Sequence, residues 1–492
     1  MNYRIIAYLL GWVLKIEAVA LVLPGITAII YREDTWYWFF ICAAFAGILG
    51  FYLSRKKNRQ GNFYSREGYA GTALAWLTMS LIGALPFFLS GRIPHYIDAL
   101  FEIVSGFTTT GASVLAEVEY LGRGLLFWRS FTHWLGGMGV LVLLLAILPF
   151  SGGGSHMVIM KAESPGPQVS KLVPRVRQTA LVLYGIYTAL TVTMIITYLI
   201  SGMNFFDAVC IAFGTAGTGG FCVRNNGMGS YNNVSIVLAT FWMLIFGVNF
   251  NIYYLILSQK WKDALKSEEL KAYLSIFLTA ALVMTAVTFI SIYSKENEGA
   301  KGFFLSLRDS AFTAASIQTT TGFSTADFSV WPIVCRWIIL LLMVFGACAG
   351  STGGGIKISR IVLLLKEAKS ELHYLIHPNA VKPVKFEGKV VDKTVLRSLN
   401  SYLVIYLAIL IVSVFIVSFD PAAKDFETAY SAVLATYNNI GPGLSIVSPL
   451  LNYGSFNVLT KIVLIFDMIA GRLELLPMLI LFNPSIWKRK FM

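Results

Sequence analysis

Four short runs of Thr or Asn followed by Gly recur along the chain, and each comes after an apolar segment that begins at an acidic residue. The segments read DALFEIVSGFTTTGAS from Asp98, DAVCIAFGTAGTGGF from Asp207, DSAFTAASIQTTTGFST from Asp309 and ETAYSAVLATYNNIGPG from Glu427. Glycine after Thr lets the backbone adopt positive φ, so that successive carbonyl oxygens can turn to one side. A ring of such carbonyls can replace the hydration shell of an alkali cation, and four loops from one chain would close one ring.

The residues expected to bind the cation lie at matching positions in the four runs. The distance from the acid to the last Gly of the run is 13 residues in the first three segments and 14 in the fourth. Only the second run, at 217–220, leaves its alignment uncertain by one residue. The predicted cation-binding residues are Thr109, Thr110, Gly111, Thr218, Gly219, Gly220, Thr320, Thr321, Gly322, Asn439, Ile440 and Gly441.

Each apolar segment before a run is too short to cross a bilayer, which takes about 20 residues. We therefore expect a half-helix that enters the membrane from the outer side and a loop that returns. The acid can cap this helix and complement its positive N-terminal end, while the partial negative charge of its C-terminus favours a cation. The alternative is that Gly and Thr only allow close helix packing. Four runs in register favour the pore.

The composition requires many other apolar segments to be membrane helices. The chain has 492 residues, of which 56% are hydrophobic and only 13% charged, too few charges to cover a soluble protein of this size. Basic residues gather in alternate loops between the apolar spans, as the positive-inside rule describes, so the net charge of +13 reports topology rather than nucleic-acid binding. Both termini are then cytoplasmic.

Ten membrane-crossing helices are predicted from the apolar spans and the charges of the loops. They cover 5–31, 36–53, 69–90, 125–149, 179–200, 233–257, 273–294, 333–365, 399–418 and 456–482. The predicted fold is thus an all-α integral membrane protein with four quasi-repeated units of helix, pore loop and helix around one pore, plus two extra N-terminal transmembrane helices. The expected divisions are the N-terminal pair at 1–68 and the four repeats at 69–178, 179–272, 273–397 and 398–492.

Two features interrupt the apolar pattern of the predicted spans. The run GACAGSTGGG at 346–355 lies within the eighth span, and its glycines (Gly346, Gly350, Gly353, Gly354 and Gly355) cannot sustain a regular helix. Unwound backbone at this depth must be buried or line water; the alternative is a kink that packs closely. Lys357 follows it, near the expected cytoplasmic mouth. Arg472 lies inside the last span and is expected to face the bundle interior. A salt bridge to Asp467, to Glu474 or to an acid on another helix is the alternative to an ion-facing role.

Other chemistry finds little support in the sequence. The five cysteines have no metal-ligand spacing, and a Cys210–Cys222 bridge is left open but not favoured. No nucleophile is matched with a base, so we do not expect an enzyme. No GxxxxGK[ST] run is present, so any nucleotide regulation should reside in a partner that docks on the charged segment 366–393.

These residues resemble a known family. The four Thr/Asn–Gly runs resemble the selectivity-filter loops of the Trk/Ktr/HKT superfamily of potassium-translocating proteins. WRSFTHWLGGMGVLVL from Trp128, QTTTGFST from Gln318, AGSTGGGIK from Ala349, NNIGPGL from Asn438 and AGRLELLP from Ala470 resemble its TrkH-type subunits more closely. The similarity extends over essentially the whole chain.

The resemblance implies potassium uptake across the bacterial inner membrane by a homodimer with one pore in each protomer. It implies a cytoplasmic ring of nucleotide-binding, RCK-type regulatory subunits (TrkA-like), with potassium as the bound ion and no organic cofactor. It also makes 346–355 a gating loop beneath the filter and places Arg472 below the filter, facing the path. Because the fourth run has Asn438, Asn439 and Ile440, weaker discrimination against sodium is expected. The alternatives are a proton-coupled potassium symporter and, less favoured, a different secondary transporter with inverted repeats.

Overall fold

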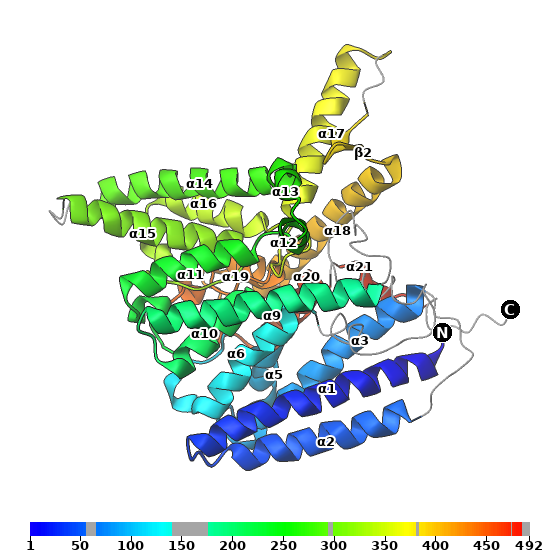
Figure 1. Ribbon diagram of the computed structural model, residues 1–492, viewed down its shortest axis with the longest axis vertical. Coiled ribbons are helices and arrows are strands. Elements are labelled where there is room, and N and C mark those ends of the chain that lie inside the picture. Colours follow the sequence, from blue (N-terminus) through cyan, green and yellow to red (C-terminus); the bar gives the residue numbers. More distant parts are fainter. Residues whose placement is uncertain (56–64, 140–175, 294–298, 380–382, 474, 485–492) are drawn as a thin grey trace.

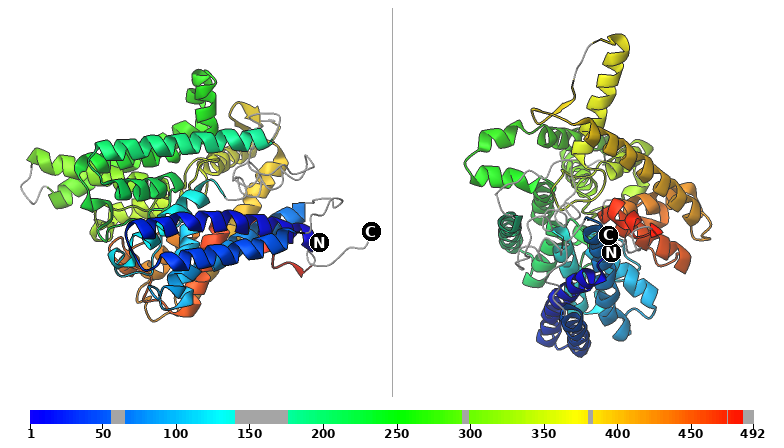
Figure 2. Two further views of the ribbon diagram at one scale, coloured as in Figure 1. Left: turned by 60° about the horizontal axis from the view of Figure 1, so that its bottom comes forward. Right: turned by 90° about the vertical axis from the view of Figure 1, so that its right-hand side faces the viewer.

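A computed structural model describes the whole chain except residues 56–64, 140–175, 294–298, 380–382, 474 and 485–492. Its described part is built almost entirely of helices, with one antiparallel hairpin of β1 (Lys385–Phe386) and β2 (Lys389–Val390). The predicted all-α class is confirmed. Figures 1 and 2 show α17 (Ile358–Ile376) and the hairpin projecting from the main body of the bundle.

The N-terminal pair consists of α1 (Tyr3–Ile30) and α2 (Trp36–Ser54), which lie side by side at one edge of the bundle (Figure 1). Small residues let their backbones touch, since a Cβ atom added to Gly11 would lie 2.7 Å from the carbonyl oxygen of Gly50. This close approach is typical of helix contacts in membranes. The pair packs against α3 (Ser65–Gly83) and α6 (Arg123–Gly137), and so flanks the first repeat.

Four helices end at the Thr/Asn–Gly runs: α5 (Tyr96–Phe107), α10 (Phe205–Gly217), α15 (Gly299–Gln318) and α19 (Phe426–Tyr437). The longer helices around them are α9 (Val176–Ile200), α11 (Asn233–Phe246), α14 (Glu268–Thr288), α16 (Ile333–Val344), α18 (Lys393–Val417) and α20 (Val458–Arg472). Shorter helices are α4 (Leu85–Leu89), α12 (Phe250–Leu257), α13 (Trp261–Lys266) and α21 (Leu476–Ile480), and a π-helical turn at Phe289–Tyr293 continues α14.

In the described residues, six helices are long and apolar enough to cross a membrane, or seven if α11 and α12 form one bent span. The prediction of a single helix over 233–257 is wrong, because the chain bends by 88° between α11 and α12. Two contacts explain the break. A Cβ atom on Gly247 would lie 2.9 Å from the Thr319 side chain, and the Asn249 side chain caps α12 by accepting from the Asn251 amide. The second half of the predicted span 125–149 lies outside the described residues.

Two details of the predicted half-helices are also corrected. The third is not short: α15 has 20 residues, so Asp309 lies within it rather than at its start. The acids are not the caps, since Asn204 caps α10 and Asp425 caps α19. Asp98 and Glu427 instead occupy the first turn of their helices, where their charge still complements the helix dipole.

Candidate cation-binding ring

The four loops share one backbone conformation. Each has a non-glycine residue with φ between 55° and 59°, followed two positions later by a glycine with φ between 76° and 96°. The first members are Thr109, Thr218, Thr320 and Asn439, and the second are Gly111, Gly220, Gly322 and Gly441. The register that the sequence left uncertain in the second loop is therefore fixed at Gly220.

The same two backbone hydrogen bonds hold each turn. In the first loop, the Thr109 amide donates to Gly106 at 3.1 Å and the Thr110 amide donates to Ser105 at 2.8 Å. The other three loops repeat both bonds, at 3.0–3.1 Å and at 2.8 Å. These turns terminate their helices in the way of a Schellman motif, but with Thr or Asn in the left-handed position that Gly usually takes. A non-glycine residue there is strained by roughly 1–2 kcal/mol, and such strain is concentrated at functional sites.

The loops contact one another in a closed cycle. A Cβ atom on any of the four ring glycines would overlap or crowd a carbonyl oxygen of the next loop. The pairs run from Gly111 to Gly219, from Gly220 to Thr321, from Gly322 to Ile440 and from Gly441 back to Thr110. One cavity borders all four glycines. The predicted residues of the ring are therefore brought together around one axis, in chain order.

The fourth side of the ring differs from the others in its side-chain contacts. The side-chain Nδ2 of Asn439 donates to Thr110 Oγ1 at 3.0 Å and to the carbonyl oxygen of Met468 at 2.8 Å. Thr hydroxyls in loops one and three make different contacts, pairing within their own loops, such as Thr319 with Thr321 at 2.7 Å. The Asn therefore ties its loop both to the first loop and to α20.

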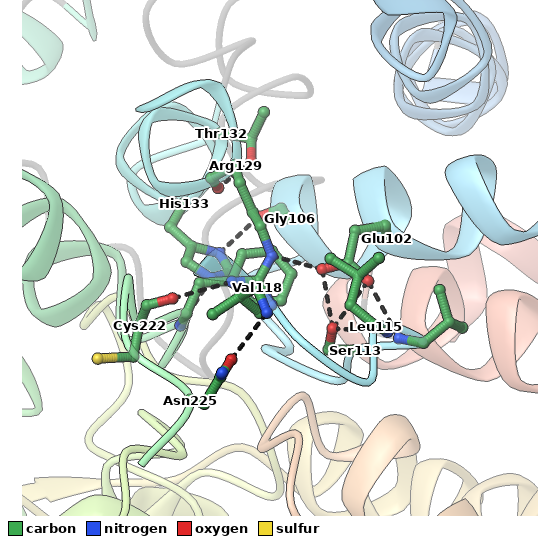
Figure 3. A network of polar contacts seen from close by, with 12 residues as sticks. Glu102, Gly106, Ser113, Leu115, Val118, Arg129, Thr132, His133, Cys222 and Asn225 are labelled. Atoms are coloured by element: carbon green, nitrogen blue, oxygen red, sulfur yellow. Dashed lines mark hydrogen bonds and ion pairs between the residues drawn. The ribbon is translucent and has the colours of Figure 1, made fainter. Parts of the chain in front are cut away.

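A buried ion pair behind the first two loops was missed by the sequence interpretation (Figure 3). Arg129 on α6 donates to the Glu102 carboxylate on α5 at 2.5 Å and to the Cys222 carbonyl oxygen at 3.1 Å. Its guanidinium lies 3.6 Å from the centroid of the Phe221 ring. Glu102 also accepts from Ser113 at 3.1 Å. The pair thus joins loops one and two.

His133 joins the same two loops from inside the bundle (Figure 3). Its Nδ1 lies 2.8 Å from the Gly106 carbonyl oxygen, and the Phe221 amide donates to its Nε2 at 3.2 Å. An amide N–H can only donate, so Nε2 must accept and Nδ1 must carry the proton of a neutral imidazole. Both His133 and Arg129 lie on one face of α6, a signal given by their spacing of four residues in WRSFTHW.

The glycine-rich segment forms a non-helical loop between α16 and α17 and lies directly against loops three and four. The Gly354 amide donates to Thr320 Oγ1 at 2.6 Å. A Cβ atom on Gly353 would lie 2.9 Å from the Thr319 carbonyl oxygen, and one on Gly354 would overlap that of Asn438. The loop is closed at its base, where the Gly346 amide donates to Ile356 at 2.9 Å.

Three further gate residues of the sequence prediction complete this loop. Gly350 and Gly355 have φ values of 72° and 65°, which favour glycine. The Lys357 ammonium is buried and donates to the carbonyl oxygens of Gly353 and Gly354. The positive charge of the Lys357 side chain is thus held against the tip of the loop at Gly353 and Gly354.

Arg472, at the end of α20, joins the glycine loop to the end of α6. Its guanidinium donates to the carbonyl oxygens of Thr352 at 2.7 Å, Gly136 at 2.6 Å and Gly137 at 2.7 Å. Asp467, one of the predicted salt-bridge partners, instead accepts from Ser413 Oγ at 2.8 Å. Glu474, the other, lies outside the described residues.

The acids at the start of the four segments each meet a basic side chain. Asp98 lies 2.6 Å from Lys461 and Glu427 lies 2.9 Å from Arg336, while Asp309 lies 2.8 Å from Arg308. Asp207 lies 3.7 Å from Arg224, and its charge raises the pKa of that guanidinium. Two of the pairs join different helices, since Lys461 is on α20 and Arg336 is on α16, whereas Arg308 is the chain neighbour of Asp309.

All five cysteines are free thiols, so the Cys210–Cys222 bridge does not form. Among the described residues, no cluster of three or more His, Cys, Asp or Glu side chains could hold a metal ion. The polar groups that converge on the ring include backbone carbonyl and hydroxyl oxygens, and carbonyl oxygens are the groups that replace the hydration shell of alkali cations in selectivity filters.

These features define a multi-pass helical membrane protein in which four inserted helices meet at one ring of loops. Residues 35–489 match the model of the TrkH family, described as a cation transport protein. The chain is 35% identical to the Trk system potassium uptake protein TrkH of Salmonella typhimurium, over 99% of this chain and 100% of that protein. It is 34% identical to the Trk system potassium uptake protein TrkG of Escherichia coli, over 99% of each chain.

A solved structure shows the same similarity in three dimensions. The crystal structure of the potassium transporter TrkH from Vibrio parahaemolyticus matches with a TM-score of 0.86 and 31% identity, covering 99% of this chain and 100% of that one. The chain therefore belongs to the TrkH family of cation transport proteins.

Proposed function

We propose that this protein carries potassium across the bacterial inner membrane through the ring of four loops. The observation that carries the proposal is the closed cycle in which each ring glycine abuts a carbonyl oxygen of the next loop. The relatives described above are named as potassium transporters, which supports the choice of ion. Carbonyls arranged around one axis can replace the hydration shell of a cation of fitting size.

The polarity of the helices favours a channel-like path over inverted repeats. The four helices α5, α10, α15 and α19 all present their C-terminal ends to the ring, so their dipoles all favour a cation there. Inverted repeats would bring helix ends of opposite sign to the site. In this proposal the chain forms four units of helix, pore loop and helix, and both termini are cytoplasmic. The units are 69–178, 179–272, 273–397 and 398–492.

The glycine loop closes the path on the cytoplasmic side of the ring. Its contacts with Thr320 and Asn438 support this role, because they lie on the inner ends of two filter loops. Arg472 holds the loop through the Thr352 carbonyl oxygen and adds a positive charge that opposes a passing cation. A homodimer with one pore in each protomer, regulated by a cytoplasmic nucleotide-binding ring of the RCK type, completes the proposal.

Two experiments test transport. Expression in a bacterium that lacks potassium uptake should restore growth in limiting potassium, and failure of the folded, membrane-inserted protein to do so would contradict the proposal. Fluxes of potassium, rubidium and sodium into proteoliposomes, with and without a proton gradient, then separate the two modes of transport. A flux that follows the potassium gradient alone indicates a channel, whereas a flux that requires the proton gradient indicates symport.

A further inference from the structure

Glu269 is a buried carboxylate on α14 that contacts the glycine loop without belonging to it. One of its oxygens accepts from the Ala349 amide at 2.7 Å and from the Ser359 amide at 3.2 Å. These two amides stand on either side of the loop tip at Gly353 and Gly354. A single oxygen therefore binds both limbs of the loop, and its side chain is only 5% exposed.

The turn of α14 that carries Glu269 is in turn held by the hairpin. The Glu387 carboxylate accepts from Ser267 Oγ at 2.8 Å and from the Glu269 amide at 3.2 Å. Lys366 on α17 adds an ion pair with Glu268 and donates to the Lys385 carbonyl oxygen at 2.8 Å. The hairpin and the glycine loop are thus bonded to the same helical turn, one to its backbone and one to its side chain.

Glu387 lies in the two-residue turn of the hairpin, with φ of 49°, and Gly388 follows with φ of 75°. Positive φ at both central positions is the geometry of a type I′ hairpin turn, in which Asn or Asp is preferred at the first position. A Glu there adopts a strained conformation, and its longer side chain is the part that reaches α14. The hairpin is exposed apart from Phe386, which makes it accessible to another molecule.

We infer that Glu269 is the positioning residue that keeps the glycine loop against the filter, and that the hairpin at 385–390 controls it through Glu387. This inference rests on the proposed gating role of the loop. Displacement of the hairpin, by a partner on the side that we assign to the cytoplasm, removes the bonds of Glu387 to Ser267 and to the Glu269 amide. The turn then shifts, both limbs of the loop lose their shared acceptor, and the tip leaves Thr320.

The test measures rubidium flux into proteoliposomes that contain the full-length chain. Glu269→Ala should raise the basal flux about tenfold, because it removes the acceptor that both limbs of the loop share in the closed state. Glu269→Gln keeps a carbonyl acceptor of the same length and should stay near the wild-type flux. Glu367→Ala is the matched control, since Glu367 accepts from Asn400 on α18 and should leave the flux unchanged.

A double-mutant cycle tests the connection to the hairpin. Glu387→Ala should raise the flux by itself, and it should add nothing in the Glu269→Ala background if it acts through that residue. Independent, additive effects would overturn the inference, as would an unchanged flux in both single variants. Glu387 is on the exposed hairpin, so its variant keeps the test valid if Glu269→Ala fails to fold.

Deletion of residues 350–354 separates this inference from the proposed function. If the deletion raises flux but neither carboxylate variant does, the loop is a gate and our assignment of Glu269 is wrong. If neither the wild type nor the deletion variant carries rubidium, the proposed function itself fails.

Discussion

The Gly354 amide donates a hydrogen bond to Thr320 Oγ1 at 2.6 Å, and so joins the glycine loop directly to a turn of the ring. Thr320 is one of the four non-glycine residues of the ring loops that have positive φ, and its φ is 59°. A movement of the loop therefore changes the contacts of the ring residue itself. In our account, gating and cation binding meet at this pair.

Gly354→Ala should open the path. The added Cβ atom would overlap the Asn438 carbonyl oxygen and lie 2.9 Å from the Asn439 side chain, so the loop tip must move away from the ring. We expect a higher basal rubidium flux in proteoliposomes and a lower thermal stability. Gly185→Ala is the control, because nothing lies within 4 Å of a Cβ atom there. An unchanged or lower flux in the folded Gly354 variant would contradict a closing role for the loop.

Arg472→Ala should also raise the flux, for two reasons. It removes a positive charge below the ring, and it releases the loop carbonyl of Thr352. Arg472→Lys keeps the charge but cannot reach three carbonyls with the same planar group, so it separates charge from attachment. If the Lys variant behaves as the wild type and the Ala variant conducts more, charge is the main barrier. Flux that is unchanged in folded Arg472→Ala protein would refute the barrier.

Glu102→Ala should destabilise the ring and the fold. It leaves Arg129 buried without its carboxylate partner, and breaking a buried ion pair in this way costs about 3–5 kcal/mol. We expect a clearly lower midpoint of thermal unfolding in detergent, together with weaker discrimination between potassium and sodium. Glu427→Ala, which breaks a partly exposed pair with Arg336, should have a much smaller effect on stability. Equal effects of the two substitutions would argue against a supporting role for Glu102.

The repeat was predictable because it depends on local residue types, and so was its register in every loop but the second, where the Gly run at 217–220 left one residue of uncertainty. A Gly at a fixed distance from an acid marks a helix end wherever it occurs, and the four runs were found in this way. The bend at Gly247 was not predictable, since it depends on Tyr273 and Thr319, which are remote in the sequence. The apolar stretch around it has the hydropathy of a continuous span.

The supporting residues of the site were missed for a related reason. Glu102, Arg129 and His133 act through contacts between two repeats, and an isolated polar residue in an apolar helix does not reveal its partner. Glu269 is similar, because it lies at the start of a predicted span, where an acid is ordinary. The capping role of the acids was wrong because neighbouring Asn and Asp residues, such as Asn204 and Asp425, occupy the cap positions.

The equivalence of the four ring glycines can be tested by rubidium uptake into proteoliposomes that contain single alanine variants. Gly111→Ala, Gly220→Ala, Gly322→Ala and Gly441→Ala should each abolish uptake, since each added Cβ atom would crowd a carbonyl oxygen of the next loop. Gly91→Ala is the matched control: its φ of 71° imposes the same backbone strain, but nothing lies within 4 Å of the added atom. Loss of uptake in all four folded variants, with uptake retained in the control, is the predicted result. Normal uptake in any one of the four would contradict a ring to which every loop contributes.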